Sequence, residues 1–362
     1  MPEEILIEDG DPDWPYWASR PFIQKAGGLL DPREGDYFIR NICALVHVIF
    51  ERACVDTDWH GGTKPCLVFI ASEKANAWMV RDSERYAVCV SIGLLEEIWR
   101  HCLIISALPD ILTHEGRSQS PMGWTSLPMR AAIDAMDWRF IPAEVWPEDR
   151  ADHSHDLFCR SIDFILRHEI AHIQRGHLDL LKRAGIAQDS IDEMLALARA
   201  HTSKNPLYFM EFDADLISLD TILVDADEAA PLKTWDADEA AFHLLRWNMA
   251  LILVFMSFDH AGLANERHYQ GSHPAPVHRA IRTTASLSAA VARECGLSED
   301  RRMTCHDDAW AFGAMLARSL GAREGRWFGD GTTGMSFELL RSHEDELRAF
   351  MARLDREADE GA

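Results

Sequence analysis

The feature that most constrains the fold of this chain is a pair of histidines, His168 and His172, inside an apolar stretch with helical periodicity. On a helix, residues i and i+4 share one face, so both imidazoles can reach a single ion. Glu169, the second residue of the HEIAH motif, lies beside them and can hold a water molecule. The pattern therefore predicts a helix that carries a metal site. The alternative, a solvated helix face with two fortuitous histidines, is disfavoured by the apolar neighbours of the motif.

A zinc site that performs chemistry needs a third protein ligand and an open fourth position. Glu211 is the best candidate, because it lies on the next strongly predicted helix. Asp215 follows on the same face and is predicted to orient a ligating imidazole. Should Glu211 not bind the metal, Asp213 or Asp215 is the alternative third ligand. His177 is interpreted as a residue at a helix end, because a position five residues after a ligand turns away from the ligand face.

The segment around Glu211 is strongly acidic, with ten acids and one base in residues 211–240. A solvated acidic face is therefore an alternative to a metal-binding helix. The residues that flank the carboxylates are apolar, which favours a core helix with acidic groups set into it. Buried carboxylates need partners.

The predicted elements are mostly helical. Hydrophobic periodicity predicts helices at 37–54, 93–108, 156–184, 189–201, 206–224, 237–260, 306–320 and 336–356. Runs rich in β-branched and aromatic residues predict strands at 66–71 and 86–91, with a third at 76–80 that forms a sheet edge. The expected fold class is α+β, mostly α, with a small β-sheet.

Composition shifts along the chain divide it into five expected regions. They are an acidic N-terminal arm (1–32), a helix, sheet and helix (33–108), an insertion or lid (109–155), a helical core (156–283) and a C-terminal helical region (284–362). The insertion is rich in turn-forming residues and has little periodicity, which is typical of long functional loops.

The charge of the chain excludes some classes of partner. Lys and Arg number 36 against 59 Asp and Glu, so the net charge is 36 − 59 = −23. This charge disfavours binding to nucleic acid or to an anionic membrane. The longest apolar run, Met249–Phe258, is shorter than the ~20 residues of a membrane span. The acidic N-terminus does not resemble a secretory signal, and the eight cysteines form no CxxC pair. We expect reduced thiols and a cytoplasmic location.

Five short blocks occur in order along the chain: Asn76-Ala77-Trp78, the strand and Gly-Leu-Leu at 88–95, HEIAHIQRGH at 168–177, the ExxAD pattern from Glu211, and His273-Pro274 with Arg279. Taken in this order, the blocks resemble the gluzincin peptidases of the CAAX-prenyl-endopeptidase and HtpX type. A soluble relative with similar motifs is the phage-exclusion protease Lit. The chain departs from the membrane enzymes in its lack of predicted membrane spans, in a longer segment between Gly93 and His168, and in Ala275 where a second Pro is usual.

The resemblance implies a zincin-like metallopeptidase core. Zn²⁺ would be bound by His168, His172 and Glu211, with Glu169 as the general base. His273 and Arg279 would supply an oxyanion donor and its support, with Tyr269 as a further candidate. The strand at Asn76, Ala77 and Trp78 would bind an extended peptide by strand addition.

The sequence therefore predicts a soluble zinc endopeptidase that cleaves a protein substrate, in a defence, toxin or regulatory role. Two alternatives stay open: a peptidase-like zinc-binding module without proteolytic activity, and a helical protein with a fortuitous motif. A cytosolic protease needs restraint, and the insertion at 109–155, His273 or a regulatory partner would provide it. The insertion could also decorate the surface without any such role.

Overall fold

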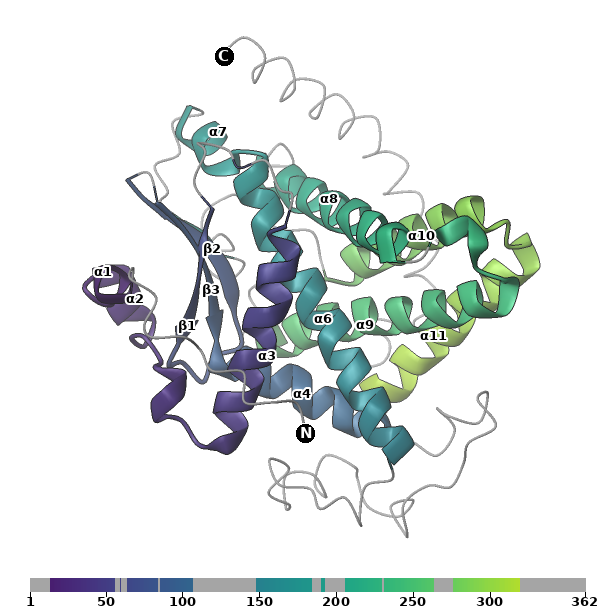
Figure 1. Ribbon diagram of the computed structural model, residues 1–362, viewed down its shortest axis with the longest axis horizontal. Coiled ribbons are helices and arrows are strands. Elements are labelled where there is room, and N and C mark those ends of the chain that lie inside the picture. Colours follow the sequence, from purple (N-terminus) through teal and green to yellow (C-terminus); the bar gives the residue numbers. More distant parts are fainter. Residues whose placement is uncertain are drawn as a thin grey trace. The chain divides into compact units, whose positions relative to one another are not determined.

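A computed structural model gives the fold of the chain, which is mostly helical with one small mixed sheet (Figure 1). Contacts within the chain divide it into two compact units, residues 1–195 with 260–264 and residues 196–259 with 265–362. The structure describes residues 14–55, 59, 64–83, 85–106, 148–183, 190–192, 206–229, 231–263 and 276–319.

The first unit contains the sheet. Its strands are β1 (Cys66–Ile70), β2 (Ala77–Asp82), β3 (Arg85–Ser91) and β4 (Ser190–Asp192), in the order β1-β3-β2-β4. β1 runs parallel to β3, whereas β2 is antiparallel to both β3 and β4.

The prediction that residues 76–80 form a sheet edge is wrong. The three residues of β4 pair with Trp78, Met79 and Val80, so β2 lies between two strands. The sequence placed residues 190–192 at the start of a helix. A strand of three residues is too short to give a period-two pattern, so periodicity could not reveal it. The remainder of the predicted helix, 193–201, lies outside the described residues.

Short N-terminal helices cover one face of the sheet. These are α1 (Trp14–Ala18) and α2 (Pro21–Ala26), followed by the 3₁₀ turn η1 (Pro32–Glu34). Trp17 and Ile23 pack with alternate residues of the strands, including Val68 and Ile70, which form one apolar cluster. Alternation places such residues on one side of a strand. The opposite side of the sheet faces α3 (Tyr37–Ala53), α4 (Ile92–Ser106) and α6 (Glu148–Gln174) (Figure 1).

Gly93, in the first turn of α4, marks a close approach between this helix and the chain before β2. A Cβ atom at this position would lie 2.2 Å from the carbonyl oxygen of Glu73. Any other residue at position 93 would clash with the Glu73 backbone, so α4 can begin directly after β3 only with a glycine there. This is the physical reason for the glycine in the Gly-Leu-Leu motif.

Helix α6 carries the HEIAH motif and begins at Glu148, eight residues before the predicted start at 156. The predicted insertion therefore ends earlier than 155. The buried residues in the first turns of α6, Arg150, His153 and Ser154, are polar, so this part of the helix has no apolar periodicity. Nδ1 of His153 lies 2.8 Å from the hydroxyl oxygen of Ser106, and Arg150 donates a hydrogen bond to the Ser106 carbonyl. Residues 107–147 lie outside the described residues, so a lid at this place stays a prediction.

The predicted continuous helix at 156–184 is interrupted. α6 ends at Gln174, and α7 (His177–Arg183) begins after Gly176, whose φ is +61°. Glycine adopts this left-handed conformation without the steric penalty that a Cβ brings, and it commonly ends helices for that reason. The break places His177 at the start of a new helix.

The second unit is helical in its described residues. Its elements are α8 (Pro206–Ala229), the 3₁₀ turn η6 (Leu232–Thr234), α9 (Ala237–Leu263), α10 (Pro276–Cys295) and α11 (Glu299–Ser319). The last residues of α9 group with the first unit. α10 packs against α8 and α11. The sequence predicted α8 and α9 but not α10, and α11 begins earlier than the predicted 306. The predicted helix at 336–356 lies outside the described residues.

One stretch of α9 has the length and the apolar composition of a membrane-spanning helix. Ala237–Phe258 is 22 residues long and apolar enough to cross a membrane, and 61% of its most apolar window is buried within the protein. The core helix of a soluble protein can have the same length and composition. The stretch is therefore weak support for a membrane span, and its burial fits a core helix.

The eight cysteines are all free thiols. Burial raises the pKa of Cys43 and Cys54 to about 12 and that of Cys159 to about 11. Such thiols stay protonated at neutral pH, and they pack as small apolar groups.

Candidate metal centre

The two histidines of the motif lie on one face of α6 and are almost fully buried, with exposed fractions of 3% and 1%. Nε2 of His168 lies 3.1 Å from Nε2 of His172, and the two rings are nearly perpendicular, with an interplanar angle of 87°. The helical spacing of four residues thus brings two ring nitrogens to one place, as the sequence predicted.

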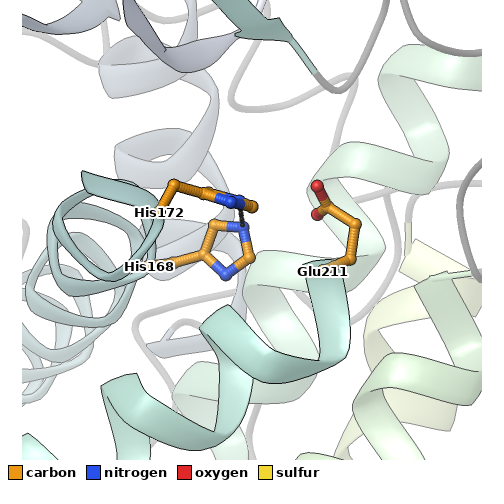
Figure 2. Close-up of side chains that lie close together, drawn as sticks. All are labelled: His168, His172 and Glu211. Atoms are coloured by element: carbon orange, nitrogen blue, oxygen red, sulfur yellow. Dashed lines mark hydrogen bonds between the residues drawn. The ribbon is translucent and has the colours of Figure 1, made fainter. Parts of the chain in front are cut away.

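Glu211 supplies the third group. Its carboxylate, carried by α8, is fully buried and points toward the two imidazoles (Figure 2). One ligand atom from each of His168, His172 and Glu211 lies within 4.8 Å of the others. These three side chains form a buried group that could hold a metal ion.

The geometry of this group fits a tetrahedral ion. Two ligands at ~2.0–2.1 Å from zinc in a tetrahedral arrangement are separated by about 3.3 Å. The histidine nitrogens are already at nearly this separation. A carboxylate oxygen of Glu211 lies within 4.8 Å of them, so the three groups are close enough to share one ion. Two imidazoles and one carboxylate are also a ligand set that catalytic zinc sites use.

Glu169 lies in the same helical turn as the two histidines and is 3% exposed. A carboxylate in such a dry environment is costly to ionise without a nearby positive charge. A metal ion held by the neighbouring imidazoles would supply this charge. Burial next to the ligands is therefore compatible with the predicted role of Glu169 as a base.

Arg279 lies next to two of the carboxylates of α8, those of Asp215 and Glu211. From α10, its guanidinium donates two hydrogen bonds to Asp215, of 2.9 and 2.8 Å. A third nitrogen, Nη1, lies 3.1 Å from a carboxylate oxygen of Glu211. All three side chains are buried. The structure pairs Asp215 with Arg279 and places Arg279 next to Glu211. The predicted roles of Asp215 toward an imidazole and of Arg279 toward an oxyanion donor stay predictions.

We expect Asp215→Asn to weaken zinc binding by ~10–100-fold without abolishing it. Without the Asp215 charge, Arg279 loses an ionic partner and attracts the Glu211 carboxylate more strongly, in competition with the metal. Chelator competition measures the affinity. Asp220→Asn, at an exposed position on the same helix, is the matched control. Wild-type zinc affinity in Asp215→Asn would show that the pair with Arg279 does not support the ligand.

His177 stands at a helix end, as the sequence predicted, but the prediction that it turns away from the other two histidines is wrong, because it is buried beside His172. Its Nδ1 lies 2.7 Å from Nδ1 of His172. On a continuous helix, position i+5 would have turned away from His172, but the break at Gly176 brings the His177 side chain back to it. The glycine directly before His177 is the sequence signal that could have indicated this break.

The other predicted site residues are placed only in part. Asn76, Ala77 and Trp78 are buried at the start of β2. The backbone of Asn76 bonds to Ser91, whose hydroxyl accepts its N–H at 2.9 Å. A role of these residues in binding substrate stays a prediction. His273 and Tyr269 lie outside the described residues.

Comparisons with protein-family models, with curated proteins and with solved structures found no match.

Proposed function

We propose that this chain is a zinc-dependent endopeptidase with a zincin-like core, of the gluzincin type that its motifs resemble. The observation that carries the proposal is the buried group of His168, His172 and Glu211, with Glu169 in the same turn as the histidines. A metal ligand set and a carboxylate beside it are the minimum that metal-assisted peptide hydrolysis requires.

Each residue of the group has a role in the proposed reaction. His168, His172 and Glu211 hold the ion. Zinc, when bound, acts as a Lewis acid and lowers the pKa of a coordinated water to ~7. Glu169 accepts the proton of the attacking water and later passes it to the leaving amine. Arg279 and Asp215 position Glu211.

The substrate of the proposed enzyme is a protein or peptide. Because β4 pairs with β2 over Trp78–Val80, an extended substrate would add to β4, which ends the sheet among the described strands. His273 remains the candidate donor to the developing oxyanion. The proposed cytoplasmic location rests on the eight free cysteines, and the proposed role in phage defence rests on the resemblance alone.

The alternative is a peptidase-like binding module that holds zinc without hydrolysis. A comparison of new protein N-termini in cells that express the wild type or Glu169→Gln separates the two. Proteolysis predicts N-termini that appear only with the wild type. Identical sets of N-termini from the two proteins would contradict the proposal and favour the binding module.

A further inference from the structure

His177 contacts the proposed metal ligand His172 at Nδ1, on the opposite side of the ring from Nε2, the proposed metal-binding nitrogen. The Nδ1 atoms of His172 and His177 are 2.7 Å apart, and the rings meet at 68°. Both side chains are buried, with exposed fractions of 1% and 0%. Two ring nitrogens at this distance need one hydrogen between them, because two lone pairs or two N–H groups would repel.

The direction of this hydrogen bond follows from the position of the metal ligands. A nitrogen that binds a metal presents a lone pair, and Nε2 of His172 faces Nε2 of His168 at 3.1 Å. When an ion is bound there, both Nε2 atoms present lone pairs to it, so neutral His172 carries its proton on Nδ1. We infer that His177 is a positioning residue: it accepts the Nδ1–H of His172, fixes its tautomer and so aims Nε2 at the metal. This inference rests on the proposed zinc site.

The local backbone explains how His177 reaches this place. Gly176 turns the chain at the end of α6, and α7 begins with His177. The amide of Leu180 then donates to the Gly176 carbonyl at 3.1 Å, which closes the first turn of α7. His172 and His177 thus stay close together although one lies on α6 and the other on α7.

The chemistry of the acceptor distinguishes this site from common ones. A ligating histidine usually donates its second N–H to a carboxylate, a backbone carbonyl or water. Here the acceptor is an imidazole, which orients the ligand without adding a negative charge. The site already buries the carboxylates of Glu169 and Glu211. A neutral acceptor avoids a third buried charge in the same place.

Two substitutions separate positioning from packing. His177→Asn retains an acceptor, because its amide oxygen can occupy the place of Nδ1. His177→Leu fills a similar volume but accepts no hydrogen bond. We expect zinc affinity, measured by chelator competition, to fall by ~10–100-fold in His177→Leu and to stay near the wild-type value in His177→Asn. His155→Leu, at an exposed position on α6, is the control.

The tautomers give a readout that packing alone would not change. In zinc-loaded protein with ¹⁵N-labelled histidine rings, long-range ¹H–¹⁵N spectra report which nitrogen is protonated. We expect the proton on Nδ1 of His172 and on Nε2 of His177, with the His177 signals identified by their loss in His177→Asn. A proton on Nδ1 of His177, or unchanged zinc affinity in His177→Leu, would overturn the inference and leave the proposed function intact. A wild-type protein that binds no zinc would overturn both.

Discussion

Replacement of His168 or Glu211 by alanine is expected to remove most of the bound zinc and to abolish the stabilisation that zinc gives. A ligand that binds only the folded state stabilises it by ~4 kcal/mol when its free concentration is about 1,000 times Kd. This corresponds to a rise in melting temperature of roughly 10 °C. Melting curves with and without zinc should therefore differ for the wild type and coincide for both variants.

This design separates the loss of metal from the loss of packing, because each variant is compared with itself. His155→Ala and Asp220→Ala change exposed residues on the same two helices, and they should keep the full zinc-dependent shift. Full zinc binding by Glu211→Ala would mean that Asp213 or Asp215 is the third ligand. Both are buried on α8.

Glu169→Gln is expected to keep zinc and to lose peptide hydrolysis by ~10²–10⁴-fold, the usual contribution of a general base. The amide has nearly the shape of the carboxylate, so the fold and the neighbouring imidazoles should be unaffected. Casein cleavage by the purified protein measures the effect. Glu148→Gln, at the first residue of the same helix, is the control.

Equal cleavage by Glu169→Gln and the wild type, with zinc intact, would remove Glu169 from the proposed mechanism. If neither protein cleaves casein while both bind zinc, the peptidase-like binding module becomes the better description. The zinc measurement therefore has to accompany the assay of hydrolysis.

The two ligand-bearing helices could be predicted because their signals are local. His168 and His172 have the spacing of one helical face, and apolar residues surround them. The carboxylates at 211 and 215 share a face of α8 for the same reason. That Glu211 lies beside the histidines depends on tertiary structure, and the sequence pointed to it only through chemistry and resemblance.

Our prediction from the sequence did not include α10, although Val277, Ile281, Leu287 and Val291 lie on its buried face at helical spacing. Thr283 and Thr284 are fully buried, and each hydroxyl donates to the carbonyl four residues earlier at 2.8 Å. Because these hydroxyls donate to carbonyls of their own helix, they can be buried without a hydrogen-bond partner on another element. The apolar residues of α10 recur with the helical period, so this helix could have been predicted from the sequence.

The pairing of Asp215 with Arg279 could not be predicted from the sequence, because it depends on tertiary structure. Arg279 lies 64 residues after Asp215 in the chain, and only the packing of α10 against α8 brings them together. The contact of His177 with His172 was hidden by a single left-handed glycine, which periodicity does not represent. Both contacts would position candidate metal ligands. Patterns of residue types along the sequence do not predict such contacts well.

Metal analysis of the purified protein, expressed in zinc-containing medium, tests the central claim most directly. The claim that His168, His172 and Glu211 form a zinc site predicts close to one equivalent of zinc per chain. It also predicts that His168→Ala, but not His155→Ala, loses that zinc. Less than about half an equivalent in the wild type, or full zinc in His168→Ala, would contradict the claim.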